Sequence, residues 1–224
     1  MLGVRSFAHD ASAVAAVEFA FISGFLMFLC LAGFDFGRYV VAAQRIEAVS
    51  YNVAQMLGQT AQSSSAIDSG DGVVTDATLQ WYQNSGMIIF PEALSDSYNQ
   101  GVAWNTLLVV NMTSLRFKLV VAGCTSGCVY KPYVIWTTGN RPCNSVFTQA
   151  ADTSSASAAT LPVDLYGPNS QIVVDVSYSF NPSFGARWLS KMTIARTTYL
   201  SPRNVSMVES SSTSSLAPNC AGVL

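Results

Sequence analysis

Cysteines are the residues of this sequence whose type and spacing are best suited to chemistry. Cys124 and Cys128 lie close together, while Cys143 and Cys220 follow separately. Closely spaced thiolates can bind zinc, whereas an even number of cysteines in an oxidising compartment forms disulfides. The second pair is not clustered in the sequence, so we predict disulfides, with zinc as the alternative. The expected bonds are Cys124 with Cys128 across a tight turn, and Cys143 with Cys220.

The sequence predicts no enzyme and no catalytic, cofactor-binding or metal-binding residues. Its only histidine, His9, precedes a long apolar segment, so the remaining chain cannot form a Ser-His-Asp or Cys-His arrangement. It has no glycine-rich phosphate loop, and Asp164, Asp175 and Glu209 show no spacing typical of paired catalytic carboxylates. A net charge of −2 and a pI near 5.2 argue against a nucleic-acid partner.

The apolar segment near the N-terminus is the element that organises the rest of the chain. Residues 14–34 supply the roughly 20 apolar positions that a helix needs to cross a bilayer. The segment is longer than the apolar part of a secretory signal peptide, and Cys30 lacks the small residues that precede a lipoprotein cysteine. We therefore predict a transmembrane helix over 14–34, preceded by a cytoplasmic N-terminal segment over 1–13.

The helix pattern continues beyond the apolar segment as an amphipathic extension over 35–58. Apolar residues such as Ile46, Val53 and Leu57 recur at steps of three and four, which predicts a packing face for a folded domain. Asp35 and Arg38 are three residues apart, so they either form a local ion pair or set the register between subunits. Small residues permit close approach of other helices, and we expect this of Gly24, Ala32, Gly33 and Gly37.

The residues after the helix predict one further domain of the α+β class. A Ser-, Gly- and Asp-rich stretch over 59–75 predicts a flexible linker, and its acidic residues Asp68 and Asp71 fit a solvated turn better than a calcium loop. Residues 76–224 are expected to form a domain with a short packing helix that reaches Ile88, capped by Asp76, weakened by Gly86 and ended by Pro91. Antiparallel strands are predicted over 107–112, 115–121, 129–136, 171–180 and 193–200. Residues 144–170 are predicted to be a mobile loop, and the serine-rich tail is predicted to be disordered apart from its cysteine.

Four segments together resemble the TadE/TadG-like family of Tad (Flp) pilus proteins. They are AAVEFAF at 15–21, GFDFGRYV at 33–40, VVDVSYSFNP at 173–182 and ARTTYLSPRN at 195–204. The chain is similar in length to TadE-type minor pilins, or pseudopilins. The resemblance implies a single-pass inner-membrane protein of a Gram-negative bacterium, with a cytoplasmic N-terminus and a periplasmic domain, that serves assembly of an adhesive pilus. The four cysteines after the helix also favour a domain outside the cytoplasm.

The resemblance also implies partners. They are other TadE-, TadF- and TadG-like subunits, the inner-membrane platform, the major pilin and a prepilin peptidase. The alternative function is a membrane-tethered periplasmic sensor or ligand-binding module, with the loop over 144–170 covering its site.

Glu18 acquires two readings from this resemblance. A prepilin peptidase cuts pilin-like precursors so that a glutamate becomes the fifth residue, which here places the cut between Ala13 and Val14. Such enzymes usually require a glycine before the cut in their substrate, where this chain has Ala13. In the other reading Glu18 belongs to a permanently retained anchor and reaches the interface with its carboxylate in water.

Overall fold

The computed structural model describes residues 11–68, 70–139, 147–151, 154, 157, 159–187, 190–211 and 216–220. The chain divides into two compact units. The first contains the chain up to Val41 together with Phe180–Met192, and the second contains Ala42–Ser179 and Thr193–Leu224. A long N-terminal helix and a following domain with an antiparallel sheet confirm the predicted α+β class.

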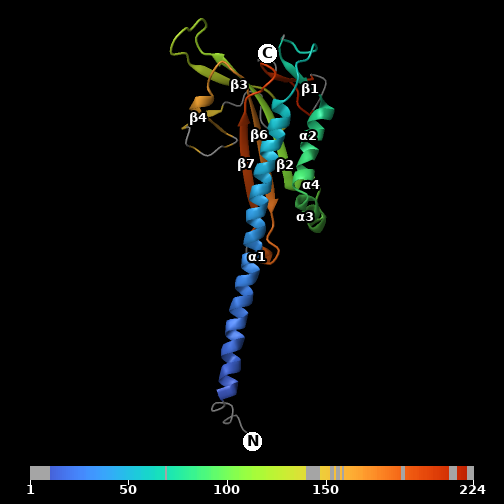
Figure 1. Ribbon diagram of the computed structural model, residues 1–224, viewed down its shortest axis with the longest axis vertical. Helices are drawn as coiled ribbons and strands as arrows, with labels where there is room; N and C mark the ends of the chain where they lie inside the picture. Colours follow the sequence, from blue (N-terminus) through green and yellow to red (C-terminus); the bar gives the residue numbers. More distant parts are fainter. Residues whose placement is uncertain are drawn as a thin grey trace. The chain divides into compact units, whose positions relative to one another are not determined.

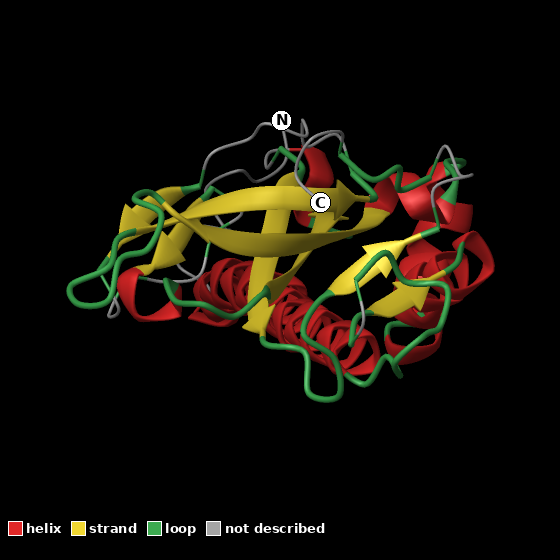
Figure 2. Ribbon diagram, turned by 90° about the horizontal axis from the view of Figure 1, so that it is seen from above, coloured by secondary structure: helices red, strands yellow, loops and turns green. Residues whose placement is uncertain are grey.

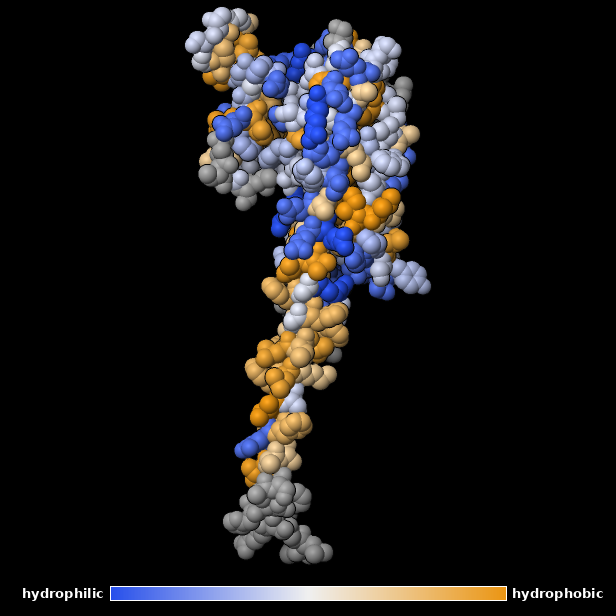
Figure 3. All heavy atoms as spheres, in the orientation of Figure 1, coloured by the Kyte–Doolittle hydropathy of each residue, from blue (hydrophilic) through white to orange (hydrophobic). Residues whose placement is uncertain are grey.

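Helix α1 (Ala11–Gly58) begins as an apolar rod, drawn in orange along its first half in Figure 3. Phe25 and Met27, for example, have 63% and 66% of their surface exposed, and no described residue buries the most apolar stretch of the helix. A helix rises 1.5 Å per residue, so residues 14–34 cover about 30 Å, the thickness of a bilayer's hydrocarbon core. This helix fits a membrane anchor.

Short helices and strands follow α1, as Figure 1 shows. They are β1 (Gly72–Val74), α2 (Asp76–Ile89), α3 (Glu92–Gln100), α4 (Trp104–Leu107), β2 (Leu108–Leu119), β3 (Tyr130–Thr137), β4 (Thr148–Ala150), β5 (Thr160–Pro162), η2 (Val163–Leu165), β6 (Gln171–Phe180), η3 (Gly185–Arg187), β7 (Met192–Leu200) and β8 (Val208–Ser210).

The main sheet has the strand order β3-β2-β6-β7, and β2 pairs antiparallel with both of its neighbours. The prediction of separate strands over 107–112 and 115–121 is wrong, because β2 is one strand with a bulge between Ser114 and Leu115. Thr113, between the two predicted strands, pairs across the sheet with Thr137, and their hydroxyls lie 3.0 Å apart. The alternation expected in β6 is present from Val174 to Phe180.

The C-terminal part of α1 forms the core of the second unit. Ile46, Val49, Val53 and Leu57 are completely buried, as the amphipathic pattern predicts. Ser50 lies within this apolar stripe, and its hydroxyl donates to the backbone oxygen of Val174 (2.9 Å) and bonds with the Thr198 hydroxyl (2.8 Å). Figure 2 shows the helices of this unit against one face of the sheet.

Helix α2 differs from its prediction at its N-terminal end. Its N-cap is Thr75, whose side-chain oxygen accepts from the Thr78 N–H, so Asp76 belongs to the first turn. At the other end the helix continues through Gly86 to Ile89 and stops before Pro91, as predicted. A Cβ at Gly86 would meet Leu108 at 3.3 Å and Val49 at 3.5 Å, so the glycine allows close packing against β2 and α1.

Two regions that were expected to be mobile contain pairs of strands. In the predicted linker over 59–75, β1 pairs in parallel with β8, which ends at Ser210, the first residue of the tail predicted to be disordered. In the predicted loop over 144–170, β4 pairs in parallel with β5, and Phe147 and Leu161 are buried. These strands are only three residues long, so they lack a periodic pattern and depend on burial by distant residues.

Two buried carboxyl groups meet where β1 joins β8. Asp71 and Glu209 are 3% and 2% exposed, so the solvated turn predicted around Asp71 is wrong. Burial raises the pKa of the Asp71 carboxyl above its ordinary value of 3.8, the charges of Glu209 and Asp68 raise it further, and Arg116 partly opposes them. Glu209 accepts from the Ile67 N–H through Oε2 (3.0 Å), while its Oε1 has no hydrogen-bond partner among the described residues.

The raised pKa of Asp71 predicts a pH-dependent stability. The folded state holds the proton more tightly than the unfolded state, so this stabilising effect is complete below pH 3.8 and is lost as pH rises through the folded pKa. We expect Asp71→Asn to be more stable than the parent chain at pH 7 and to match it below pH 3.8. Denaturant unfolding of the detergent-solubilised chain between pH 3 and pH 7 measures this.

Glu47→Gln is the control, because it removes the charge of an exposed carboxylate on the same chain. An Asp71→Asn variant that is less stable than the parent chain by the same amount at every pH would contradict this role, because the charge of the carboxylate would then have no part in the difference.

Candidate functional site

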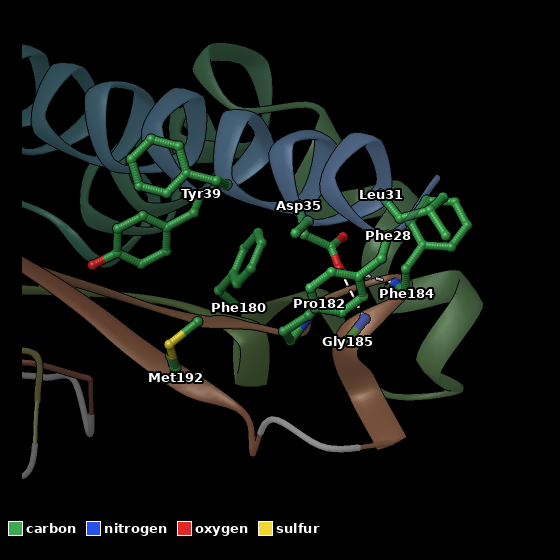
Figure 4. A pocket seen from close by; sticks show the side chains of 11 residues that line it. Phe28, Leu31, Asp35, Tyr39, Phe180, Pro182, Phe184, Gly185 and Met192 are labelled. Carbon is green, nitrogen blue, oxygen red and sulfur yellow. Dashed lines mark hydrogen bonds between the residues drawn. The ribbon is translucent and has the colours of Figure 1, made fainter. Parts of the chain in front are cut away.

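The site described here lies in the first unit, where α1 leaves its apolar stretch. The Asp35 side chain is 8% exposed, and its carboxylate accepts three backbone N–H groups. The donors are Ser183 (2.9 Å, to Oδ1), Phe184 (3.0 Å, to Oδ2) and Gly185 (2.9 Å, to Oδ2). Successive amides at the start of the short helix η3 thus surround one carboxylate, as Figure 4 shows. Hydrogen bonds to a charged acceptor are roughly twice as strong as neutral ones, so Asp35 ties residues 183–185 firmly to α1.

Arg38 takes part in the same junction. Its guanidinium donates to the Ser183 hydroxyl and lies over the Phe180 ring, 5.7 Å from the ring centroid. Its charge also acts on Asp35, so the predicted local interaction between the two residues is present as an electrostatic one. The main partners of Asp35 are nevertheless backbone groups far away in the sequence, which the three-residue spacing did not predict.

Aromatic contacts complete the attachment of residues 180–185. Phe34 packs edge-on against Phe184, with ring centroids 5.7 Å apart, and Tyr39 packs edge-on against Phe180 at 5.6 Å. Such pairs contribute about 0.5–1.5 kcal/mol each beyond the area that they bury. The aromatic residues of α1 on this side therefore act together with Asp35.

Beside this junction lies a cavity of about 550 Å³, which we call the exit groove. Phe180, Pro182 and Met192 face α1 across it in Figure 4, and Asp35 is its one charged lining residue. The groove is lined by Phe28, Leu31, Ala32, Asp35, Phe36, Tyr39, Phe180, Pro182, Phe184, Gly185 and Met192. Because both Asp35 oxygens already accept hydrogen bonds, the groove suits an apolar occupant.

The residues of the proposed cleavage site lie in α1. The helix begins at Ala11, so both Ala13 and Val14 fall in its first turns, and the Val14 side chain is 52% exposed. Glu18 is exposed and forms no hydrogen bond or ion pair with any described residue. Neither processing nor retention of the anchor is decided by this placement, so both readings of Glu18 stay open.

The small residues of α1 do not share one face. Gly33 and Gly37 are one turn apart, and at 100° per residue they point away from Asp35, whereas Gly24 and Ala32 lie on the side of Asp35. No described atom lies within 4 Å of a Cβ built at Gly24, Gly33 or Gly37. Ala32 instead lines the exit groove. The surface around Gly33 and Gly37 is thus open to another helix.

The cysteines fall outside this junction. Cys124 and Cys128 form a disulfide with a Cα–Cα distance of 5.6 Å, across a turn in which Gly127 has a φ of +63°. Cys220 is buried at 2% exposure, and its N–H donates to the Ile135 oxygen (2.6 Å). Cys143 lies outside the described residues, so its pairing with Cys220 stays a prediction. Cys30 is a free, exposed cysteine on α1.

The comparisons with known proteins concern the same helix. Residues 13–55 match the family model described as TadE-like protein. This N-terminal region is TadE-like. The match confirms the predicted resemblance. It lies entirely within α1, and it includes Glu18, the open glycines and Asp35 but not residues 183–185. No curated protein and no solved structure matches the chain.

The TadE-like helix carries the features just described, while the residues that complete its junction come from outside the match. Sequence reasoning did not single out 180–185, although Asn181 and Pro182 belong to a segment on which the resemblance was based. The turn-forming residues between two strands were its only local signal. In the part of the chain that the structure describes, no group of three or more His, Cys, Asp or Glu side chains could hold a metal ion.

The Asp35 junction predicts that removing one carboxylate releases a distant backbone segment. In Asp35→Ala we expect amide exchange at residues 183–185 to accelerate at least about tenfold, because each lost bond to a charged acceptor contributes about 1.5–3 kcal/mol. Asp35→Asn keeps one acceptor oxygen and should show a smaller effect. Hydrogen–deuterium exchange of the full chain in nanodiscs, read by mass spectrometry, measures both.

Glu47→Ala, an exposed position further along α1, is the control and should leave this exchange unchanged. Unaltered protection of residues 183–185 in Asp35→Ala would contradict the role given to the carboxylate.

Proposed function

We propose that this chain is a membrane-anchored, pilin-like minor subunit or assembly factor of a Tad-type adhesive pilus. The observation that carries the proposal is the TadE-like match over residues 13–55, on a helix whose first half is long and apolar enough to cross a membrane. In this proposal residues 14–34 cross the inner membrane once. The N-terminus then lies in the cytoplasm and the second unit in the periplasm, an oxidising compartment in which the Cys124–Cys128 disulfide forms and persists.

The subunit acts by packing its helix against other apolar helices. Gly33 and Gly37 support this role, because side-by-side glycines one turn apart let helix backbones approach closely in a membrane. Their face has no described neighbour within this chain. The proposed partners are other TadE-, TadF- or TadG-like subunits, the inner-membrane platform and the major pilin.

Gene deletion followed by pilus imaging tests the function. We expect the deletion strain to lack pili while still making the major pilin, and the wild-type gene to restore them. A Gly33→Leu, Gly37→Leu variant should reach normal membrane levels without restoring pili, because the added side chains separate the helices. Ala20→Leu, an exposed position on the same helix, should restore them.

Normal pili in the deletion strain would exclude the assembly role. Loss of the major pilin itself would favour the rival function, a periplasmic sensor that acts on expression.

We further propose that a prepilin peptidase cuts between Ala13 and Val14, so that Glu18 becomes the fifth residue. The new N-terminal ammonium of the same or a neighbouring subunit would then pair with a carboxylate that is costly to keep alone at a membrane edge. Intact-mass measurement of the membrane-extracted protein should give a chain that starts at Val14. Ala13→Arg serves as the blocked control, and a parent chain that starts at Met1 would show that the anchor is retained whole.

A further inference from the structure

The exit groove straddles the level at which α1 leaves the bilayer. Phe28 and Leu31 belong to the apolar span over 14–34, within about 9 Å of its end, whereas Tyr39 lies about 8 Å beyond it at 1.5 Å per residue. The headgroup layer of a bilayer is about 5–8 Å thick on each side of the hydrocarbon core. The groove therefore runs from the outer end of the acyl region to the level of the headgroups.

The lining of the groove is that of a hydrocarbon site. Apart from the carboxylate of Asp35, which already accepts three N–H groups, its walls are aromatic, aliphatic or thioether side chains and a glycine. Its volume of about 550 Å³ lies in the range of roughly 300–1,000 Å³ of small-ligand sites. Phe184 and Met192 at its edge are 50% and 38% exposed, which places further apolar surface next to it.

The charges at this level suit an anionic group. Arg38 stands beside the groove over the Phe180 ring. Asp35, the one carboxylate among the lining residues, accepts three backbone N–H groups in addition to its interaction with the Arg38 charge. Cations at the depth of the headgroups attract phosphate.

We propose that the exit groove binds one phospholipid of the leaflet next to the folded domain. An acyl chain lies along Phe28, Leu31 and Phe180, and it continues above the hydrocarbon core as far as Tyr39, with the phosphate near Arg38. Continuity of the groove with the apolar span is the reason to assign it to a lipid: a lipid reaches it from the bilayer without leaving hydrocarbon. The inference rests on the membrane anchoring in the proposed function and is independent of the pilus role.

Photo-cross-linking distinguishes this lipid from ordinary lipid around the span. The full chain carries p-benzoylphenylalanine in place of Tyr39, or in place of Val40 as a control at the same depth but on another side of α1. In nanodiscs of phosphatidylethanolamine and phosphatidylglycerol, irradiation should add the mass of one phospholipid at position 39 and little at position 40. Equal adducts at both positions would overturn the proposal, as would a polypeptide adduct at position 39, which would assign the groove to another subunit.

Filling the groove gives a second, independent measurement on chains with natural residues. Ala32→Phe places a ring in the groove, whereas Ala20→Phe adds the same bulk to an exposed position of the span. Native mass spectrometry of protein extracted from the same nanodiscs should show one retained phospholipid in the parent and in Ala20→Phe. In Ala32→Phe the retained fraction should be about tenfold lower, as for a loss of about 1.4 kcal/mol of binding free energy.

Retention that is equal in all three chains would overturn the proposal, as would no retention in the parent. Neither readout involves pili, so their failure would leave the assembly function to be decided by imaging.

Discussion

Burial of the α1 stripe between Ala42 and Leu57 is the interaction on which the second unit depends. The stripe supplies completely buried side chains to one face of the sheet, and it comes from the same helix whose first half has an apolar surface. Ser50, in the middle of the stripe, fixes the position of the helix along the sheet. Its hydroxyl has hydrogen-bond partners only when Val174 of β6 and Thr198 of β7 lie beside it. An apolar stripe alone is tolerant of sliding, whereas a buried hydroxyl without a partner costs about 1–3 kcal/mol.

A second constraint operates where the helix leaves its apolar stretch. A buried carboxylate is costly unless its charge is compensated, and Asp35 is only 8% exposed. Asp35 obtains that compensation from three amides of the turn between β6 and β7, and Arg38 adds a bond to the same turn. The residues thus hold a returning segment of chain against α1, and that segment forms one wall of an apolar groove. The hydrogen bonds of Asp35 therefore both attach residues 183–185 to α1 and form the groove.

The ends of the second unit are joined by a different device. Strand β1, which follows α1, pairs in parallel with β8 near the C-terminus, and Trp136 donates its indole N–H to the Val208 oxygen (2.7 Å) beneath them. Two carboxyl groups are enclosed in this closure, with only partial compensation. Burying these two carboxyl groups costs free energy, and this cost falls where β1 pairs with β8, two strands separated by most of the domain's sequence.

What the sequence determined by itself was the local pattern. The apolar run over 14–34 has the length of a membrane span, while the stripe carried by Ile46, Val53 and Leu57 and the alternation of β6 each have a period of their own. The helix, its packing face and the α+β class therefore followed from residue order. The TadE-like character of the helix was likewise visible in contiguous residues. The spacing of Cys124 and Cys128 similarly suits the short turn that their disulfide closes.

Only the tertiary structure decided which distant groups meet. Asp35 lies three residues from Arg38, and spacing alone suggested a simple pair, but its carboxylate also accepts the amides of 183–185 once the chain returns to α1. Strands β1 and β8 are too short to show a period, so they form because each pairs with the other. Gly86 was predicted to weaken its helix and proved to be a point of close packing, since its neighbours are Val49 and Leu108. Local sequence encodes period and propensity, whereas a buried charge or a bare glycine is explained by the groups that folding brings to it.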